Sequence, residues 1–151
     1  MPTFQEYTSR SFGHKVNKSA RLMSQRMAQL FKENGYNISI EQWRLLLYLW
    51  REDGVTQNFL AETTSKDEPS VSRIINTMEK NNLVIRARHP HDRRTNLIYL
   101  TESGRNVRDG LMAIGARMNN DITEGVDPDE LSVCVKVLEK VLDNCNKLLG
   151  N

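Results

Sequence analysis

The chain of 151 residues, with 38% hydrophobic and 26% charged residues, is long enough for one folded domain with a substantial core and too polar for a membrane protein. The net charge is only +2, but basic residues gather in two stretches, 10–32 and 83–97, while residues 105–151 are slightly acidic. The beginning of the chain lacks the basic and apolar regions of a signal peptide, and Cys134 and Cys145 make no disulfide framework, so we expect a protein of the reducing cytoplasm.

Apolar spacing predicts a long helix and a core helix in the first third of the chain. Over residues 10–33 the apolar side chains step by four and three residues, the spacing of a coiled-coil stripe: Val16, Ala20, Met23, Met27 and Leu30. Asn34-Gly35 ends this helix. Ser39 and Gln42 then form the capping box of a second helix, over residues 40–52, which is apolar on much of its surface and belongs in the core.

The next segment predicts two helices separated by a polar turn. Thr56 can cap a short helix over residues 57–64. Proline is favoured at the first helical position, so Pro69 should begin a helix over residues 69–81. The apolar residues of that helix fall on one face: Val71, Ile74, Ile75 and Met78.

A hairpin follows these helices. Residues 83–88 and 96–100 are rich in β-branched and aromatic side chains and predict two strands, joined by the basic loop 89–95. Helix, helix, short helix, turn, helix and hairpin is the order of a winged helix-turn-helix. We therefore predict a mainly α protein with a small β-hairpin wing, whose DNA-binding region covers residues 37–101.

Two polar surfaces of this region suit duplex DNA. Opposite its apolar face, the helix 69–81 carries groups that can reach base edges and phosphates in a major groove: Pro69, Ser70, Ser72, Arg73, Asn76, Thr77 and Lys80. A narrow minor groove attracts an inserted arginine, and the wing supplies Arg86, Arg88, His91, Asp92, Arg93 and Arg94. The sequence thus predicts a sequence-specific, DNA-binding regulator of transcription, with the wing loop 89–95 in the minor groove.

The two ends of the chain predict a homodimer. Thr101 caps a long helix with a stripe of Val107, Leu111, Ile114 and Met118, and Asp127-Pro128 starts a last helix with a stripe of Leu131, Val135, Leu138, Leu142, Cys145 and Leu149. A small winged domain cannot cover these stripes and that of the first helix, so we expect residues 1–36 and 102–151 to mediate dimerisation within one compact domain. Two-fold pairing predicts a palindromic operator.

Residues 83–104 resemble the wing signature of the MarR family of bacterial regulators. The family has Asp-x-Arg in the wing and a strand ending in Leu-Thr-x-x-Gly, which Asp92, Arg94, Leu100, Thr101 and Gly104 match. The resemblance implies an obligate homodimer, Arg94 in the minor groove and Asp92 holding the wing. It also implies a repressor that releases DNA when a small aromatic ligand binds. The family usually has glycine where Asn82 stands, and asparagine can serve the same left-handed geometry.

Other readings of the sequence remain open. The same fold could be a winged-helix protein-interaction module that no longer reads DNA, or a dimer in which ligand sensing dominates. A candidate ligand pocket takes in His14, Trp43 and Tyr48, although ordinary core packing explains the aromatic residues equally well. No enzyme motif is present, and no cofactor or metal site is expected.

Overall fold

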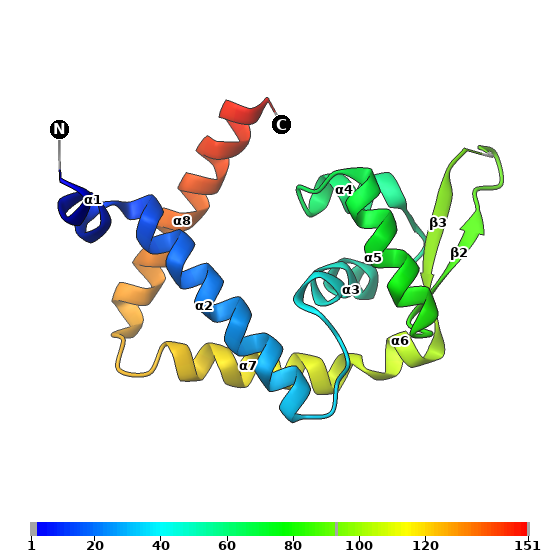
Figure 1. Ribbon diagram of the computed structural model, residues 1–151, viewed down its shortest axis with the longest axis horizontal. Helices are drawn as coiled ribbons and strands as arrows, with labels where there is room; N and C mark the ends of the chain where they lie inside the picture. The colour runs from blue at the N-terminus through cyan, green and yellow to red at the C-terminus, as the bar shows by residue number, and fades with distance from the viewer. Residues whose placement is uncertain (1–2, 93, 151) are drawn as a thin grey trace. The chain divides into compact units, whose positions relative to one another are not determined.

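The computed structural model describes residues 3–92 and 94–150, and the chain divides into two compact units, residues 1–115 and 116–151. The elements, in chain order, are α1 (Phe4–Arg10), α2 (Phe12–Glu33), α3 (Ile40–Arg51), β1 (Val55–Thr56), α4 (Gln57–Thr63), α5 (Glu68–Lys80), β2 (Val84–Arg88), β3 (Asn96–Leu100), α6 (Glu102–Asn106), α7 (Arg108–Ile122) and α8 (Pro128–Leu149) (Figure 1). The predicted mainly α fold with a hairpin wing is confirmed. No helix among the described residues is long and apolar enough to cross a membrane.

The N-terminal region differs from the prediction of one helix beginning near Arg10. A short helix, α1, precedes α2, and Ser11 separates the two in extended conformation. The Ser11 N–H donates to the Tyr7 carbonyl at 2.8 Å, and its hydroxyl accepts from the His14 N–H at 3.3 Å. Ser11 therefore ends one helix and caps the next, a role that helical periodicity alone does not reveal.

A three-stranded antiparallel sheet in the order β1-β3-β2 packs with α3, α4 and α5 in the first unit (Figure 1). In the hairpin, Val84 pairs with Leu100 and Arg88 with Asn96. The strand order makes β2 an edge strand of this sheet. The core is aliphatic with one fully buried phenylalanine, and its largest members include Phe31, Leu45, Leu46, Leu49, Leu60, Ile75, Met78 and Ile98. The predicted core helix and the apolar face of the helix after Pro69 both contribute to it.

Thr101 caps a helix as expected, but that helix is interrupted. The five-residue α6 ends at Asn106 with Val107 as its C-cap, and α7 starts at Arg108. The α7 stripe is covered within the chain, since Leu111 is 0% and Ile114 is 6% exposed. We expected that a single chain could not bury the apolar stripes of its first helix and of its last two long helices. For α7 this expectation is wrong.

Apolar residues remain exposed on α2 and α8. In α2, Val16, Leu22 and Met23 are 38%, 51% and 40% exposed, and burial begins only at Leu30. The second unit holds α8, in which no residue is buried and Leu142 is 63% exposed. Asp127 caps α8 by accepting from two backbone N–H groups, and Gly150 ends it in left-handed conformation. Exposed apolar faces of this kind are typical of association surfaces.

Candidate nucleic-acid interface

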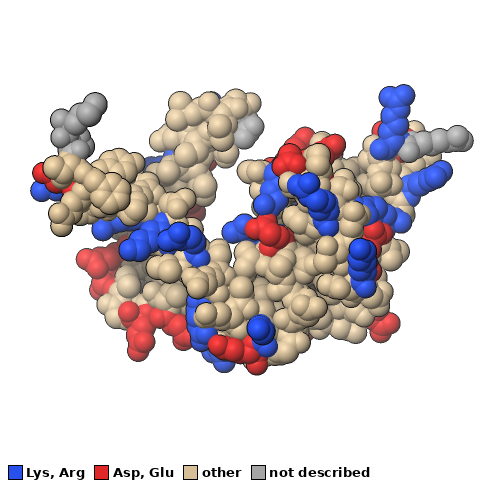
Figure 2. All heavy atoms as spheres, viewed as in Figure 1, with Lys and Arg blue, Asp and Glu red and all other residues tan. Residues whose placement is uncertain are grey.

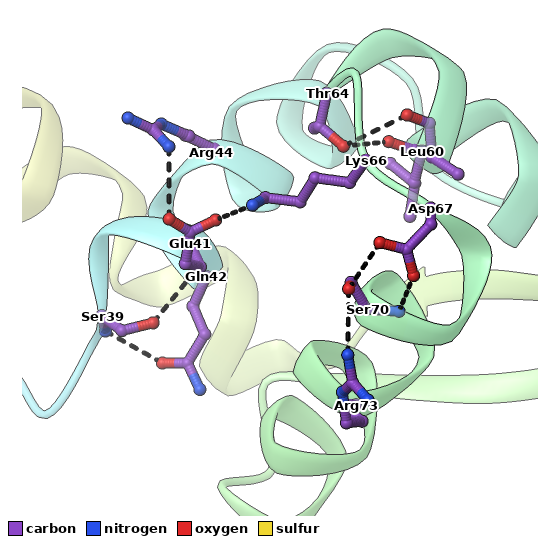
Figure 3. Close-up of polar contacts among 11 residues, drawn as sticks. Ser39, Glu41, Gln42, Arg44, Leu60, Thr64, Lys66, Asp67, Ser70 and Arg73 are labelled. Atoms are coloured by element: carbon purple, nitrogen blue, oxygen red, sulfur yellow. Dashed lines mark hydrogen bonds and ion pairs between the residues drawn. The ribbon is translucent and has the colours of Figure 1, made fainter.

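The second helix of the helix-turn-helix, α5, begins one residue before the predicted start. Asp67 is its N-cap and Pro69 the second helical residue. Asp67 accepts from the Ser70 N–H and from the Ser70 hydroxyl, both at 2.8 Å, and the Arg73 guanidinium donates to that hydroxyl at 3.0 Å (Figure 3). The hydrogen bond from the Ser70 hydroxyl is the main cause that holds the pKa of Asp67 below its ordinary value, and the bond from the Ser70 N–H is the second cause. This cap fixes where α5 starts.

An ion-pair bridge fastens the turn before α5 to α3. Lys66 Nζ lies 2.7 Å from Glu41 Oε2, and Arg44 donates to the other carboxylate oxygen at 3.2 Å (Figure 3). Ser65, beside Lys66, has a φ of 52°, which few residues other than glycine and asparagine adopt. The bridge therefore ties the turn between α4 and α5 to the first turn of α3.

The polar face of α5 is accessible. Pro69, Arg73, Asn76, Thr77 and Lys80 are exposed, while Ser70 and Ser72 are half-buried. The opposite face buries Val71, Ile75 and Met78. Figure 2 shows Lys and Arg side chains over α5 and the hairpin, with acidic side chains among them.

The wing loop is shaped by Asp92. Its carboxylate accepts from the Arg94 backbone N–H at 2.9 Å and from the Thr95 hydroxyl at 2.7 Å. The Thr95 hydroxyl, followed by the Arg94 N–H, lowers the pKa of Asp92. His91, Asp92 and Arg94 are exposed at the tip, as is Arg88 at the end of β2. Arg93 lies outside the described residues.

Arg86 differs from the other wing cations, because its side chain is only 19% exposed and faces α5. Its guanidinium forms an ion pair with Glu79 and donates to Asn76 Oδ1 at 2.6 Å and to the Ser72 carbonyl at 3.0 Å. Glu79 was not among the predicted site residues. Its place seven residues after Ser72 on α5 is the sequence signal that could have singled it out.

The hairpin starts at a left-handed residue. Asn82 has a φ of 55°, so asparagine serves the geometry for which the family usually has glycine. Its carbonyl accepts from the Thr101 hydroxyl at 2.5 Å, which joins the two ends of the wing.

The three candidate ligand residues have separate surroundings. Trp43 packs edge-on against Phe31 and Trp50, with ring centroids 5.4 and 5.6 Å away. Tyr48 donates to the Thr63 carbonyl at 3.0 Å and lines an open groove with Arg44, Leu47, Arg51, Thr63 and Thr64. Neither Trp43 nor the half-buried His14 lines that groove.

Three packed helices, α3, α4 and α5, followed by a hairpin whose strand β2 contacts α5, define a winged helix-turn-helix protein. The MarR family model matches residues 36–95. The uncharacterized HTH-type regulator YwoH of Bacillus subtilis is 31% identical over 64% of this chain and 68% of its own length. The uncharacterized HTH-type regulator YdgJ of the same organism is 27% identical over 74% of this chain and 68% of its own length. The chain belongs to the MarR family of transcriptional regulators.

Solved structures agree with this assignment. The chain is similar to Staphylococcus aureus MepR, solved in complex with DNA, with 25% identity and a TM-score of 0.80. The match covers 89% of this chain and 98% of MepR.

Proposed function

We propose that the chain is a homodimeric, ligand-responsive repressor that acts in the cytoplasm on a palindromic operator. In each subunit α5 enters the major groove and the wing loop 89–95 enters the adjacent minor groove. The observation that carries this proposal is the accessible polar face of α5 beside an exposed, arginine-bearing wing tip. MepR, a similar protein solved with DNA, supports it.

The α5 residues divide by chemistry. Arg73 and Lys80 supply cations for phosphates or guanine, and Ser70, Ser72, Asn76 and Thr77 supply short hydrogen-bonding groups. Pro69 contributes only apolar contact, because proline has no N–H. In the wing, Arg94 is the minor-groove residue, Asp92 shapes the loop, Arg88 and Arg93 neutralise phosphates, and His91 supplies a hydrogen-bonding group.

A gel shift with the DNA upstream of the chain's own coding sequence tests this proposal. Arg94→Ala should weaken binding at least tenfold, on the order of 1–3 kcal/mol. Arg108→Ala, which removes an exposed cation outside α5 and the wing, should bind like wild type. Equal affinity of Arg94→Ala and wild type would overturn the wing assignment. Failure of wild type to prefer any sequence would favour a protein-interaction module.

The effector is proposed to be a small aromatic anion held in the groove beside Tyr48. Arg44 and Arg51 line this groove and can pair with a carboxylate, while Leu47 offers apolar contact. A thermal-shift screen of hydroxybenzoates and related phenols, followed by release from labelled DNA, tests it. A ligand that raises the melting temperature of wild type but not of Arg51→Ala supports the groove; equal shifts in both contradict it.

A further inference from the structure

We propose that Arg86 is a positioning residue that locks the wing against α5, and that it does not contact DNA. This inference rests on the DNA-binding function proposed above. It separates Arg86 from the other wing cations, with which the sequence pattern groups it.

All but one of the acceptors around Arg86 lie on three successive turns of α5; the other is Gln57 Oε1 of α4, 3.5 Å from Nη2. Ser72, Asn76 and Glu79 follow the i, i+4, i+7 spacing of one edge of a helix. Nη1 of Arg86 donates to Asn76 and Glu79, and Nη2 donates to the carbonyl and the hydroxyl of Ser72 at 3.0 and 3.3 Å. Both terminal nitrogens of the guanidinium are therefore engaged inside the protein, which leaves little donor capacity for a phosphate.

The backbone contributes to the same lock. Because β2 is an edge strand, its outward N–H groups have no partner strand. Glu79 Oε1 accepts the Arg86 N–H at 3.0 Å, while Arg86 is paired in register with Ile98 of β3. The Glu79 carboxylate thus accepts hydrogen bonds from both the backbone N–H and the guanidinium of Arg86.

The lock also orients a side chain that we expect to read DNA. A guanidinium only donates, so its bond to Asn76 fixes the amide oxygen of Asn76 toward Arg86. The amide nitrogen of Asn76 is then the end left for acceptors on the bases. Arg86 therefore acts on sequence preference through Asn76 and through the angle of the wing.

Fluorescence anisotropy with two labelled duplexes tests the proposal. One duplex is enriched by wild type from a random-sequence library, and the other is its scrambled version, titrated over about 50 to 200 mM salt. Arg86→Lys keeps the charge, but the compact ammonium of lysine cannot donate to Ser72, Asn76 and Glu79 together as the planar guanidinium does. We expect about tenfold weaker binding to the enriched duplex, unchanged binding to the scrambled duplex and an unchanged salt slope.

Arg88→Gln is the matched control, because Arg88 lies on the same strand and the same face but is exposed. It should weaken binding to both duplexes and reduce the salt slope by about 0.9, the value for one phosphate contact. If Arg86→Lys binds as wild type while Arg86→Gln shows this loss of slope, Arg86 contacts phosphate and the inference is overturned.

Glu79→Gln provides a second variant that does not alter Arg86, should Arg86→Lys fail to fold. Removing a negative charge near DNA would tighten binding to both duplexes if simple electrostatics governed the site. The lock instead predicts weaker binding to the enriched duplex alone, and tighter binding to both would overturn it. If wild type enriches no sequence, the proposed function fails. If wild type enriches a sequence that both lock variants bind equally well, only this inference fails.

Discussion

The indole N–H of Trp50 donates a hydrogen bond of 2.9 Å to the backbone carbonyl of Gly104. The bond joins the end of α3 to α6, 54 residues later. Gly104 is buried, and a Cβ added there would lie 2.1 Å from the Leu83 carbonyl oxygen. The glycine of the wing signature is therefore required by a close approach of two backbones, not by a turn.

Trp50→Phe should lower the free energy of unfolding by about 1–3 kcal/mol more than Trp43→Phe, which loses the same ring area, because the buried Gly104 carbonyl loses its hydrogen-bond donor. Trp43→Phe is the control, since Trp43 packs edge-on within the same aromatic cluster. Urea unfolding of both variants measures the difference. Equal losses would show that the Trp50 hydrogen bond contributes nothing beyond packing.

Asn82→Ala should cost about 1 kcal/mol of unfolding free energy, because alanine at a φ of 55° meets the steric penalty of the left-handed region. Asn82→Gly avoids that penalty and should stay close to wild type. Asn81→Ala, at a φ of −87°, is the neighbouring control. Thermal unfolding distinguishes the three, and a loss in Asn82→Gly as large as in Asn82→Ala would contradict the conformational explanation.

The pKa of Asp92 should rise toward its ordinary value of 3.8 in Thr95→Val, because the Thr95 hydroxyl is the main cause of its depression. A carboxylate whose pKa is depressed on folding contributes stability above its unfolded pKa and loses it as pH falls through the folded value. The stability that Asp92 contributes to the wing should thus be constant between about pH 5 and 8 and be lost only as the pH falls below the ordinary value of 3.8.

Carboxyl carbon NMR titration measures the Asp92 shift directly. Asp67, whose depressed pKa has a separate cause in Ser70, is an internal control that should titrate alike in both proteins. An unchanged Asp92 pKa in Thr95→Val would rule out the Thr95 hydrogen bond as its cause.

Leu142→Glu should shift the chain from dimer to monomer, because it places a charge in the exposed apolar stripe of α8. Asn144→Glu adds the same charge to an exposed position of the same helix, about 160° from Leu142 around the helix axis, and should leave the dimer intact. Sedimentation velocity over a range of concentrations measures the state. A dimer that persists in Leu142→Glu would exclude this stripe as the association surface.

The sequence by itself predicted the elements whose signals are local. Capping at Ser39 and Thr56, the apolar face of α5 and the two strands of the wing all follow from spacing within a few residues, and all are confirmed. The break at Ser11 and the separate α6 were missed, because both segments are helical on either side and only the cap geometry interrupts them.

Tertiary structure decided what each charged side chain does. Arg86, Arg88 and Arg94 look alike in a basic stretch, yet only pairing of β2 beside α5 brings Arg86 to Ser72, Asn76 and Glu79. Likewise, periodicity could not tell the covered stripe of α7 from the bare one of α8. Spacing along a chain specifies which residues share a face, whereas burial and pairing depend on what the fold brings against that face.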